Sequence, residues 1–165
     1  MRTGSSSPLS EHRFMARAVE LAIRAEAKGN LPIAAVLVLD GEVVATGQNQ
    51  TSFPIVHPGR HAETLALAAV PEALANRLPE MTCFTTLEPC LMCFGSLVIH
   101  GVARVVFGAR DPVGGAIDLI QHLPPYVARK AGSIQWLGPT APELCEPLWQ
   151  RIAKKYELWS TMQEA

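Results

Sequence analysis

The sequence predicts an α/β protein in which helices cover both faces of a mixed five-stranded β-sheet, giving three α-β-α layers. Short apolar runs of strand length alternate with longer segments whose apolar residues recur at helical spacing. The first two runs, 33–39 and 43–45, are separated only by Asp40–Gly41, a pair typical of a two-residue hairpin. Two later runs, 81–87 and 103–108, flank a helix-like segment, which indicates a right-handed parallel crossover.

The remaining elements follow from the same patterns. The second predicted helix is rich in Ala and Leu, and Pro71 is expected to interrupt it. Pro89 is expected just inside the start of the third helix, and Pro147 is expected to restart the last one as a first-turn residue. The expected helices cover residues 11–28, 61–74, 89–100 and 144–159, and a fifth strand covers 133–137.

Composition is typical of one globular domain, expected over 11–165 after a disordered segment, 1–10, that is rich in serine. The formal net charge of −1 gives no global sign of nucleic-acid binding. No apolar run is long enough to span a membrane or to act as a secretory signal, so we expect a cytoplasmic protein. Four cysteines are too few for a disulfide framework, and Cys83 and Cys145 are expected to be buried apolar residues.

The residues that carry chemistry lie at the starts of two predicted helices. His61 and Glu63 begin the second helix, and Cys90 and Cys93 share one face at the start of the third. One imidazole and two thiolates are three zinc ligands, which leaves a fourth position for water, as in catalytic zinc sites. A carboxylate beside such a site can act as a general acid and base. A purely structural zinc module is disfavoured, since no fourth ligand has suitable spacing.

A His-x-Glu pair followed by Pro-Cys-x-x-Cys is the signature of zinc deaminases. From Leu31 to Asp111 the chain resembles the cytidine deaminase superfamily, which implies a cytidine-deaminase-like fold and a homodimer. The stretches 86–90 and 105–111 resemble bacterial tRNA adenosine deaminases, whereas 93–95 resembles guanine deaminases.

The resemblance implies a role for each matching residue. His61, Cys90 and Cys93 would hold one Zn²⁺ per chain, with a water as the fourth ligand. Glu63 would move protons between that water, the ring nitrogen and the departing ammonia. Asn49 resembles the asparagine that hydrogen-bonds the substrate in these enzymes.

Four further residues are expected to contact substrate. Phe94 lies beside a metal ligand, and Asp111 ends the second tRNA-deaminase-like motif. Tyr156 and Trp159 lie near the end of the last predicted helix, where they either cover the pocket or pin that helix to the sheet.

Together these residues predict a zinc-dependent hydrolytic deaminase that removes an exocyclic amino group as ammonia. The preferred substrate is a nucleobase, a nucleoside or a similar small aminated heterocycle, with a guanine-deaminase-like site. The alternative is a tRNA-specific adenosine deaminase that converts wobble adenosine to inosine. It ranks second because residues 143–165 carry three basic side chains against four acidic ones, with no clear basic footprint for RNA. A non-catalytic partner subunit with the same fold is an outside alternative, which the presence of Glu63 opposes.

Overall fold

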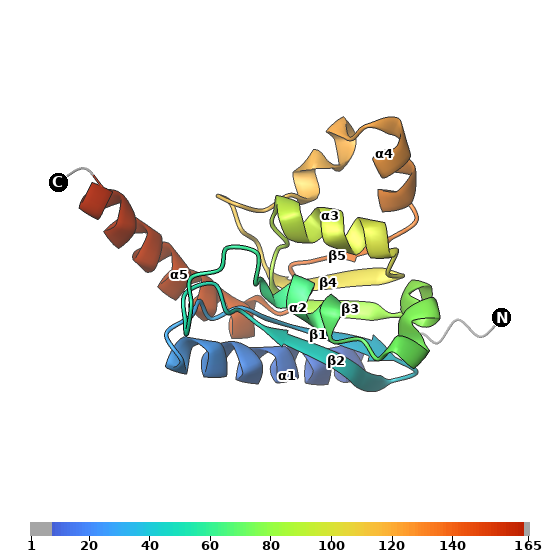
Figure 1. Cartoon of the computed structure of the whole chain (residues 1–165), viewed down its shortest axis with the longest axis horizontal. Helices are drawn as coiled ribbons and strands as arrows, with labels where there is room; N and C mark the ends of the chain where they lie inside the picture. The colour runs from blue at the N-terminus through green and yellow to red at the C-terminus, as the bar shows by residue number, and fades with distance from the viewer. Residues whose placement is uncertain (1–7, 164–165) are drawn as a thin grey trace.

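A single five-stranded sheet organises the computed structural model, which describes the backbone of residues 8–163 and the side chains of residues 11–157. The strands are β1 (Ala34–Leu39), β2 (Glu42–Gln48), β3 (Thr82–Leu87), β4 (Arg104–Ala109) and β5 (Gln135–Leu137). Their order is β2-β1-β3-β4-β5 (Figure 1). β1 pairs antiparallel with β2 and β3, whereas the β3–β4 and β4–β5 pairs are parallel. The predicted mixed five-stranded sheet is therefore confirmed.

Helices cover both faces of this sheet, as Figure 1 shows. They are α1 (Pro8–Ala27), α2 (Ala62–Ala68), α3 (Leu91–His100), α4 (Pro125–Ala131) and α5 (Pro142–Gln163), with 3₁₀ helices η1 (Glu72–Glu80) and η2 (Ile117–His122). α1 and α5 share one apolar core with the sheet, and α2, α3 and α4 share the other. Among the described residues, no helix is both long and apolar enough to cross a membrane.

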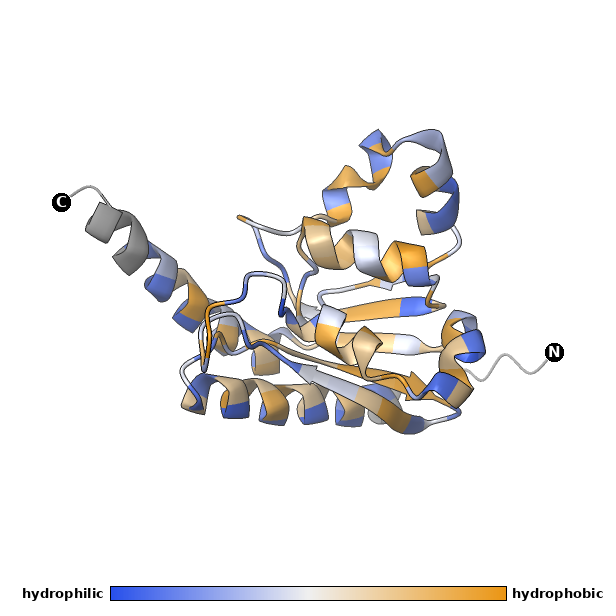
Figure 2. Cartoon of the chain, in the orientation of Figure 1, coloured by the Kyte–Doolittle hydropathy of each residue, from blue (hydrophilic) through white to orange (hydrophobic). Residues whose placement is uncertain are grey.

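Strand β1 is buried on both faces because it separates the two cores. Ala35, Leu37 and Leu39 face α2 and α3, while the alternate residues Val36 and Val38 face α1 and α5. The outer surface of α1 is hydrophilic and its inner surface is apolar (Figure 2). A continuous apolar run therefore indicates a central strand here.

The hairpin between β1 and β2 has the predicted turn. Asp40 and Gly41 have φ angles of 52° and 81°, and Leu39 pairs directly with Glu42. Positive φ at both turn residues matches the right-handed twist of the flanking strands. This turn places β2 at the sheet edge, where its last residues run toward the loop that precedes His61.

Several predicted helix boundaries were wrong, mostly around prolines. α1 begins at Pro8, so residues 8–10 are helical, while the rest of the predicted disordered segment lies outside the described residues. α2 ends at Ala68, and Pro71 caps η1, because proline lacks the N–H that a continuing helix needs. Pro89 lies outside α3, whose N-cap is Cys90.

The C-terminal third of the chain differs more from the expectation. η2 and α4 were not predicted, since the Pro-rich segment between them has no clear helical period. α5 begins at Pro142 and contains Pro147 in its interior. Cys145 and Leu148, on either side of this proline, are buried in the core shared with α1. Packing therefore holds the helix together despite the lost hydrogen bond. Both predicted non-ligand cysteines, Cys83 and Cys145, are buried.

Candidate active site

Three metal-ligating side chains meet where α2 and α3 begin. His61 and Cys90 are the N-cap residues of α2 and α3, both with extended backbone, and Cys93 lies one turn into α3. The Sγ atoms of both cysteines lie 3.5 Å from the Nδ1 atom of His61. All three donor atoms lie within 4.8 Å of one another. The sequence prediction that these residues form one cluster is confirmed.

The donor spacing fits a tetrahedral zinc ion. With Zn–S and Zn–N bonds of about 2.3 and 2.05 Å, a tetrahedral angle separates sulfur from nitrogen by about 3.6 Å. The observed separations of 3.5 Å agree with that value. Hydrogen bonds from Cys93 and His61 lower the pKa of Cys90 to about 4, despite its partial burial. The His61–Cys90–Cys93 cluster is therefore a zinc site to which the described residues supply three donor atoms.

Glu63 lies beside the cluster without being one of its ligands. It belongs to the first turn of α2 and is 3% exposed. The Thr85 hydroxyl donates to its Oε1 atom at 3.0 Å, and the Cys93 thiol donates to its Oε2 atom at 3.2 Å. Burial raises the pKa of Glu63 above its usual value. A carboxyl group in this position can accept a proton from a group in the pocket and return it.

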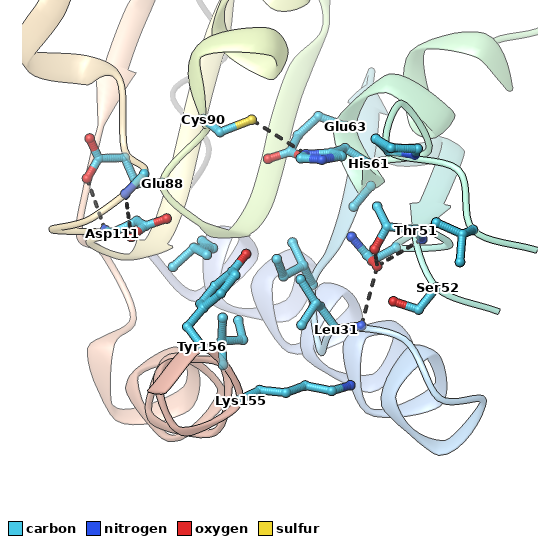
Figure 3. Close-up of a pocket in the computed structure, with 18 residues that line it drawn as sticks. Leu31, Thr51, Ser52, His61, Glu63, Glu88, Cys90, Asp111, Lys155 and Tyr156 are labelled. Carbon is cyan, nitrogen blue, oxygen red and sulfur yellow. Dashed lines mark hydrogen bonds between the residues drawn. The ribbon is translucent and has the colours of Figure 1, made fainter. Parts of the chain in front are cut away.

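A pocket of about 440 Å³ opens in front of the metal ligands and Glu63. This volume is within the usual range for small-ligand sites. Figure 3 shows that the pocket is lined from three sides, with Thr51 and Ser52 opposite Glu88 and Asp111, and with α5 supplying Lys155 and Tyr156. Leu31, Ile33, Leu87 and Ile152 provide apolar wall. A pocket of this volume with apolar walls and a few polar groups can hold a small aromatic ligand.

Asn49 is buried in the pocket wall with its amide orientation fixed. Its Oδ1 atom accepts hydrogen bonds from the Leu31 amide, the Thr51 amide and the Thr51 hydroxyl, at 3.3, 3.2 and 2.9 Å. Its Nδ2 atom is buried and has no hydrogen-bond partner among the described residues. Because a buried donor without a partner is costly, Asn49 is suited to donate to a bound ligand.

Glu88 is a buried acid in the pocket wall that the sequence motif contains but did not single out. It accepts hydrogen bonds from the backbone amides of Asp111 and Ile117, both at 3.1 Å. Asp111, a predicted contact, lines the pocket opposite Thr51. The only sequence signal for Glu88 is its place directly before Pro89, because its partners lie more than 20 residues away.

The other predicted contacts differ in their placement. Tyr156 lines the pocket and is half exposed. Phe94 does not reach the pocket, since its ring is buried in the core and stacks on Trp136 at a centroid distance of 4.8 Å. The side chain of Trp159 lies outside the described residues. The spacing of apolar residues in the sequence does not show whether an aromatic side chain lines the pocket, as Tyr156 does, or packs in the core, as Phe94 does. A residue next to a metal ligand on a helix can point into the core.

Comparison with known proteins supports this site. The family model for the cytidine and deoxycytidylate deaminase zinc-binding region matches residues 9–109. The tRNA-specific adenosine deaminase of Bacillus subtilis is 42% identical over 113 residues, covering 67% of this chain and 68% of the relative.

Two solved structures are also similar. One comes from studies of A-to-I editing by tRNA:A34 deaminases at the wobble position of transfer RNA. It has a TM-score of 0.72 at 31% identity and covers 83% of this chain and 99% of its own. Guanine deaminase from Bacillus subtilis has a TM-score of 0.53 at 32% identity, covering 60% of this chain and 64% of its own. The family model covers residues 9–109, which include the His61–Cys90–Cys93 site. The chain therefore belongs to the cytidine and deoxycytidylate deaminase zinc-binding family, and it is a zinc-dependent deaminase.

Proposed function

We propose that this protein is a tRNA-specific adenosine deaminase, which hydrolyses an adenosine of tRNA to inosine and ammonia. The observation that carries the proposal is the 42% identity to the Bacillus subtilis tRNA-specific adenosine deaminase over 113 residues, which cover 67% of this chain and 68% of the relative. The similarity to a structure from the tRNA:A34 deaminase studies, which covers nearly all of that chain, supports it. The sequence alone favoured a small heterocycle, and these relatives favour the alternative.

The chemistry requires a water to replace an amino group on an aromatic carbon. When bound, zinc polarises a water and makes it acidic enough to react near neutral pH. Glu63 accepts the water proton, because its buried carboxyl lies beside the ligand cluster and has a raised pKa. It then passes this proton to the ring nitrogen, takes a second proton from the hydroxyl group added at the ring carbon, and gives that proton to the amine as the C–N bond breaks, so the products are inosine and ammonia. The Thr85 hydroxyl holds the carboxyl in place during both transfers.

Base recognition is assigned to the walls of the pocket. Asn49 donates from Nδ2 to an acceptor atom of the purine, because its oxygen is already occupied by three donors. Leu31, Ile33 and Ile152 contact the faces and edges of the ring. Tyr156 lines the pocket and is half exposed, so its ring can stack on a base.

The test compares adenosine in RNA with free heterocycles. Ammonia release is measured with an adenosine-bearing anticodon stem-loop, and with guanine, adenine, cytosine, their nucleosides and ammeline, at two ionic strengths. We expect turnover of the stem-loop that falls with added salt, since phosphate contacts release counterions. Efficient turnover of guanine or another free heterocycle, with no turnover of the stem-loop, would replace the proposal with the small-molecule reading.

We also propose that the protein is a homodimer, as the resemblance implies. The outward face of α3 carries Leu91, Met92 and Ile99, all exposed. No charged residue occurs between Leu91 and Ile99. An uncharged apolar face on a helix that carries two zinc ligands is suited to burial against the same face of a second copy.

A further inference from the structure

Glu88 is the most deeply buried acid in the wall of the pocket that has no part in the proposed proton transfers. Its side chain is only 2% exposed. It follows β3 directly and precedes Pro89 and Cys90, the second of which is the N-cap of α3, the zinc-ligand helix. A buried carboxylate is costly unless hydrogen bonds and a counter-charge compensate for lost hydration. The hydrogen-bond and ion-pair partners of Glu88 therefore indicate its role.

Both carboxylate oxygens of Glu88 bind the backbone of one segment, 111–117. The Asp111 amide donates to Oε2 and the Ile117 amide donates to Oε1, each at 3.1 Å. These amides mark the two ends of a turn that enters the pocket wall at Asp111 and Gly114. Within the turn, the Val113 and Gly114 amides donate to Oδ1 of Asp111. One buried side chain thus joins both ends of the turn.

The turn is also fitted closely to Glu88. A Cβ atom added at Gly115 would lie 2.4 Å from Cδ of Glu88 and 2.5 Å from the Asp111 carbonyl oxygen. Gly115 forms an isolated bridge with Cys90, and the Ala116 amide donates to the Pro89 carbonyl at 3.0 Å. The turn therefore rests on the same few residues that carry the first cysteine ligand.

A cation balances the charge of this acid. Nε of Arg110 lies 3.3 Å from Oε2 of Glu88, and Nη2 of the same arginine lies 2.9 Å from Asp118 at the start of η2. The side chain of Arg110 is 44% exposed, so the guanidinium group lies at the surface while the carboxylate of Glu88 is buried. The pair links β4 to η2 across the turn. The carboxylate of Glu88 thus contacts both ends of segment 111–117 and the arginine that directly precedes it.

We propose that Glu88 is a positioning residue: it holds segment 111–117 against the zinc-ligand helix and thereby fixes the pocket wall that receives the substrate base. The inference rests on the proposed function for its kinetic consequence, although the contact itself does not. Glu88 moves no proton in the reaction. Its loss should weaken substrate binding more than it slows the chemical step, because the metal ligands and Glu63 are held by other contacts.

Two variants break the same contact from opposite sides. Glu88→Gln replaces one acceptor oxygen with an NH₂ group that must face an amide donor, and it removes the charge next to Arg110. Gly115→Ala pushes the turn away from an unchanged Glu88. Glu80→Gln is the matched control, since Glu80 is an exposed acid that pairs with Arg77 outside the pocket lining.

Three quantities are measured on the full chain: zinc content, hydrogen exchange of the peptides covering 111–117 and 91–100 without substrate, and KM and kcat on the anticodon stem-loop. We expect both variants to keep zinc and to speed exchange in 111–117 by at least about tenfold, with little change in 91–100. We expect KM to rise by about tenfold while kcat stays within about threefold. The control should match the wild type.

Several results would overturn the role of Glu88. They are unchanged exchange in 111–117, loss of zinc, exchange that rises equally throughout the chain, or a fall in kcat at unchanged KM. The role would also be overturned if a variant showed faster exchange in the turn but had the same KM as the wild-type protein, measured with a substrate that the wild-type protein turns over. If the wild-type protein turns over no RNA, the proposed function fails, but the exchange measurement still decides whether Glu88 holds the turn.

Discussion

Glu63 is the residue that we propose to transfer protons in the reaction. Replacing it with Gln keeps the side-chain size and the hydrogen bond from the Thr85 hydroxyl, but removes the group that accepts a proton. We expect Glu63→Gln to bind zinc and fold normally while ammonia release falls by about 10²–10⁴-fold. The measurement is kcat at saturating substrate, beside elemental analysis for zinc. Glu72→Gln, on the exposed 3₁₀ helix η1, serves as control. Retention of more than about a tenth of the wild-type kcat would exclude proton transfer by Glu63.

The cysteines provide a second test at the scale of single residues. Cys90 is a metal ligand, whereas Cys145 is buried in the core between α5 and the sheet. Cys90→Ala should reduce zinc content and lower thermal stability together, because the free energy of metal binding is part of the free energy of folding. Cys145→Ser should retain zinc at the wild-type level. Full zinc occupancy in Cys90→Ala would contradict the three-ligand site.

At the scale of elements, the contact between α2 and β2 sets the position of His61 and Glu63. Gly47 of β2 lies so close to α2 that an added Cβ would be 1.9 Å from the Ala62 carbonyl oxygen and 2.5 Å from the Ala66 nitrogen. Both atoms belong to the helix backbone, so the helix as a whole must move. We expect Gly47→Ala to destabilise the fold by about 1–3 kcal/mol, measured by urea unfolding, and to lower activity.

The control for Gly47 is Gly95, a glycine in helix α3. Gly95 in α3 has no atom within 4 Å of an added Cβ. Alanine there should leave the free energy of unfolding unchanged or raise it by about 0.5–1 kcal/mol, since glycine weakens helix interiors. If Gly95→Ala lost more stability than Gly47→Ala, the close contact between Gly47 of β2 and helix α2 would not be the feature that makes alanine unfavourable.

Helix boundaries also show where local signals stop being sufficient. The hairpin at Asp40 and the crossover from β3 through α3 to β4 follow from local turn chemistry and element length, and both are confirmed. Pro147 inside α5 was misread because local propensity predicts a break there, while packing of Leu148 and Ile152 against the sheet outweighs it. The short helix α4 is held by contacts with α3 and η2 that no local pattern reports.

At the scale of the whole molecule, the exposed face of α3 tests the proposed homodimer. Ile99 is 70% exposed and is expected to be buried against a second copy. Ile99→Asp should convert the protein to a monomer, because a charge in an apolar interface loses its hydration. Light scattering after size exclusion measures the mass. Ile23→Asp, at an exposed isoleucine on α1 across the sheet, should leave the mass unchanged. Equal masses for wild type and Ile99→Asp would exclude this face.

Residue type and local spacing are enough to predict the zinc ligands, the nearby carboxylate Glu63, the hairpin between β1 and β2, and the parallel pairing of β3 with β4. These depend on residue type and on spacing within short segments, as in the two motifs that contain His61 and Cys90. Three further features are visible only in the folded chain: the Asn49 Nδ2 atom has no hydrogen-bond partner among the described residues, Phe94 belongs to the core, and Glu88 accepts hydrogen bonds from both ends of the 111–117 turn. Each of these features depends on contacts between residues that are far apart in the chain. The periodicity of a sequence does not show which distant side chain will lie next to a given residue in the folded protein.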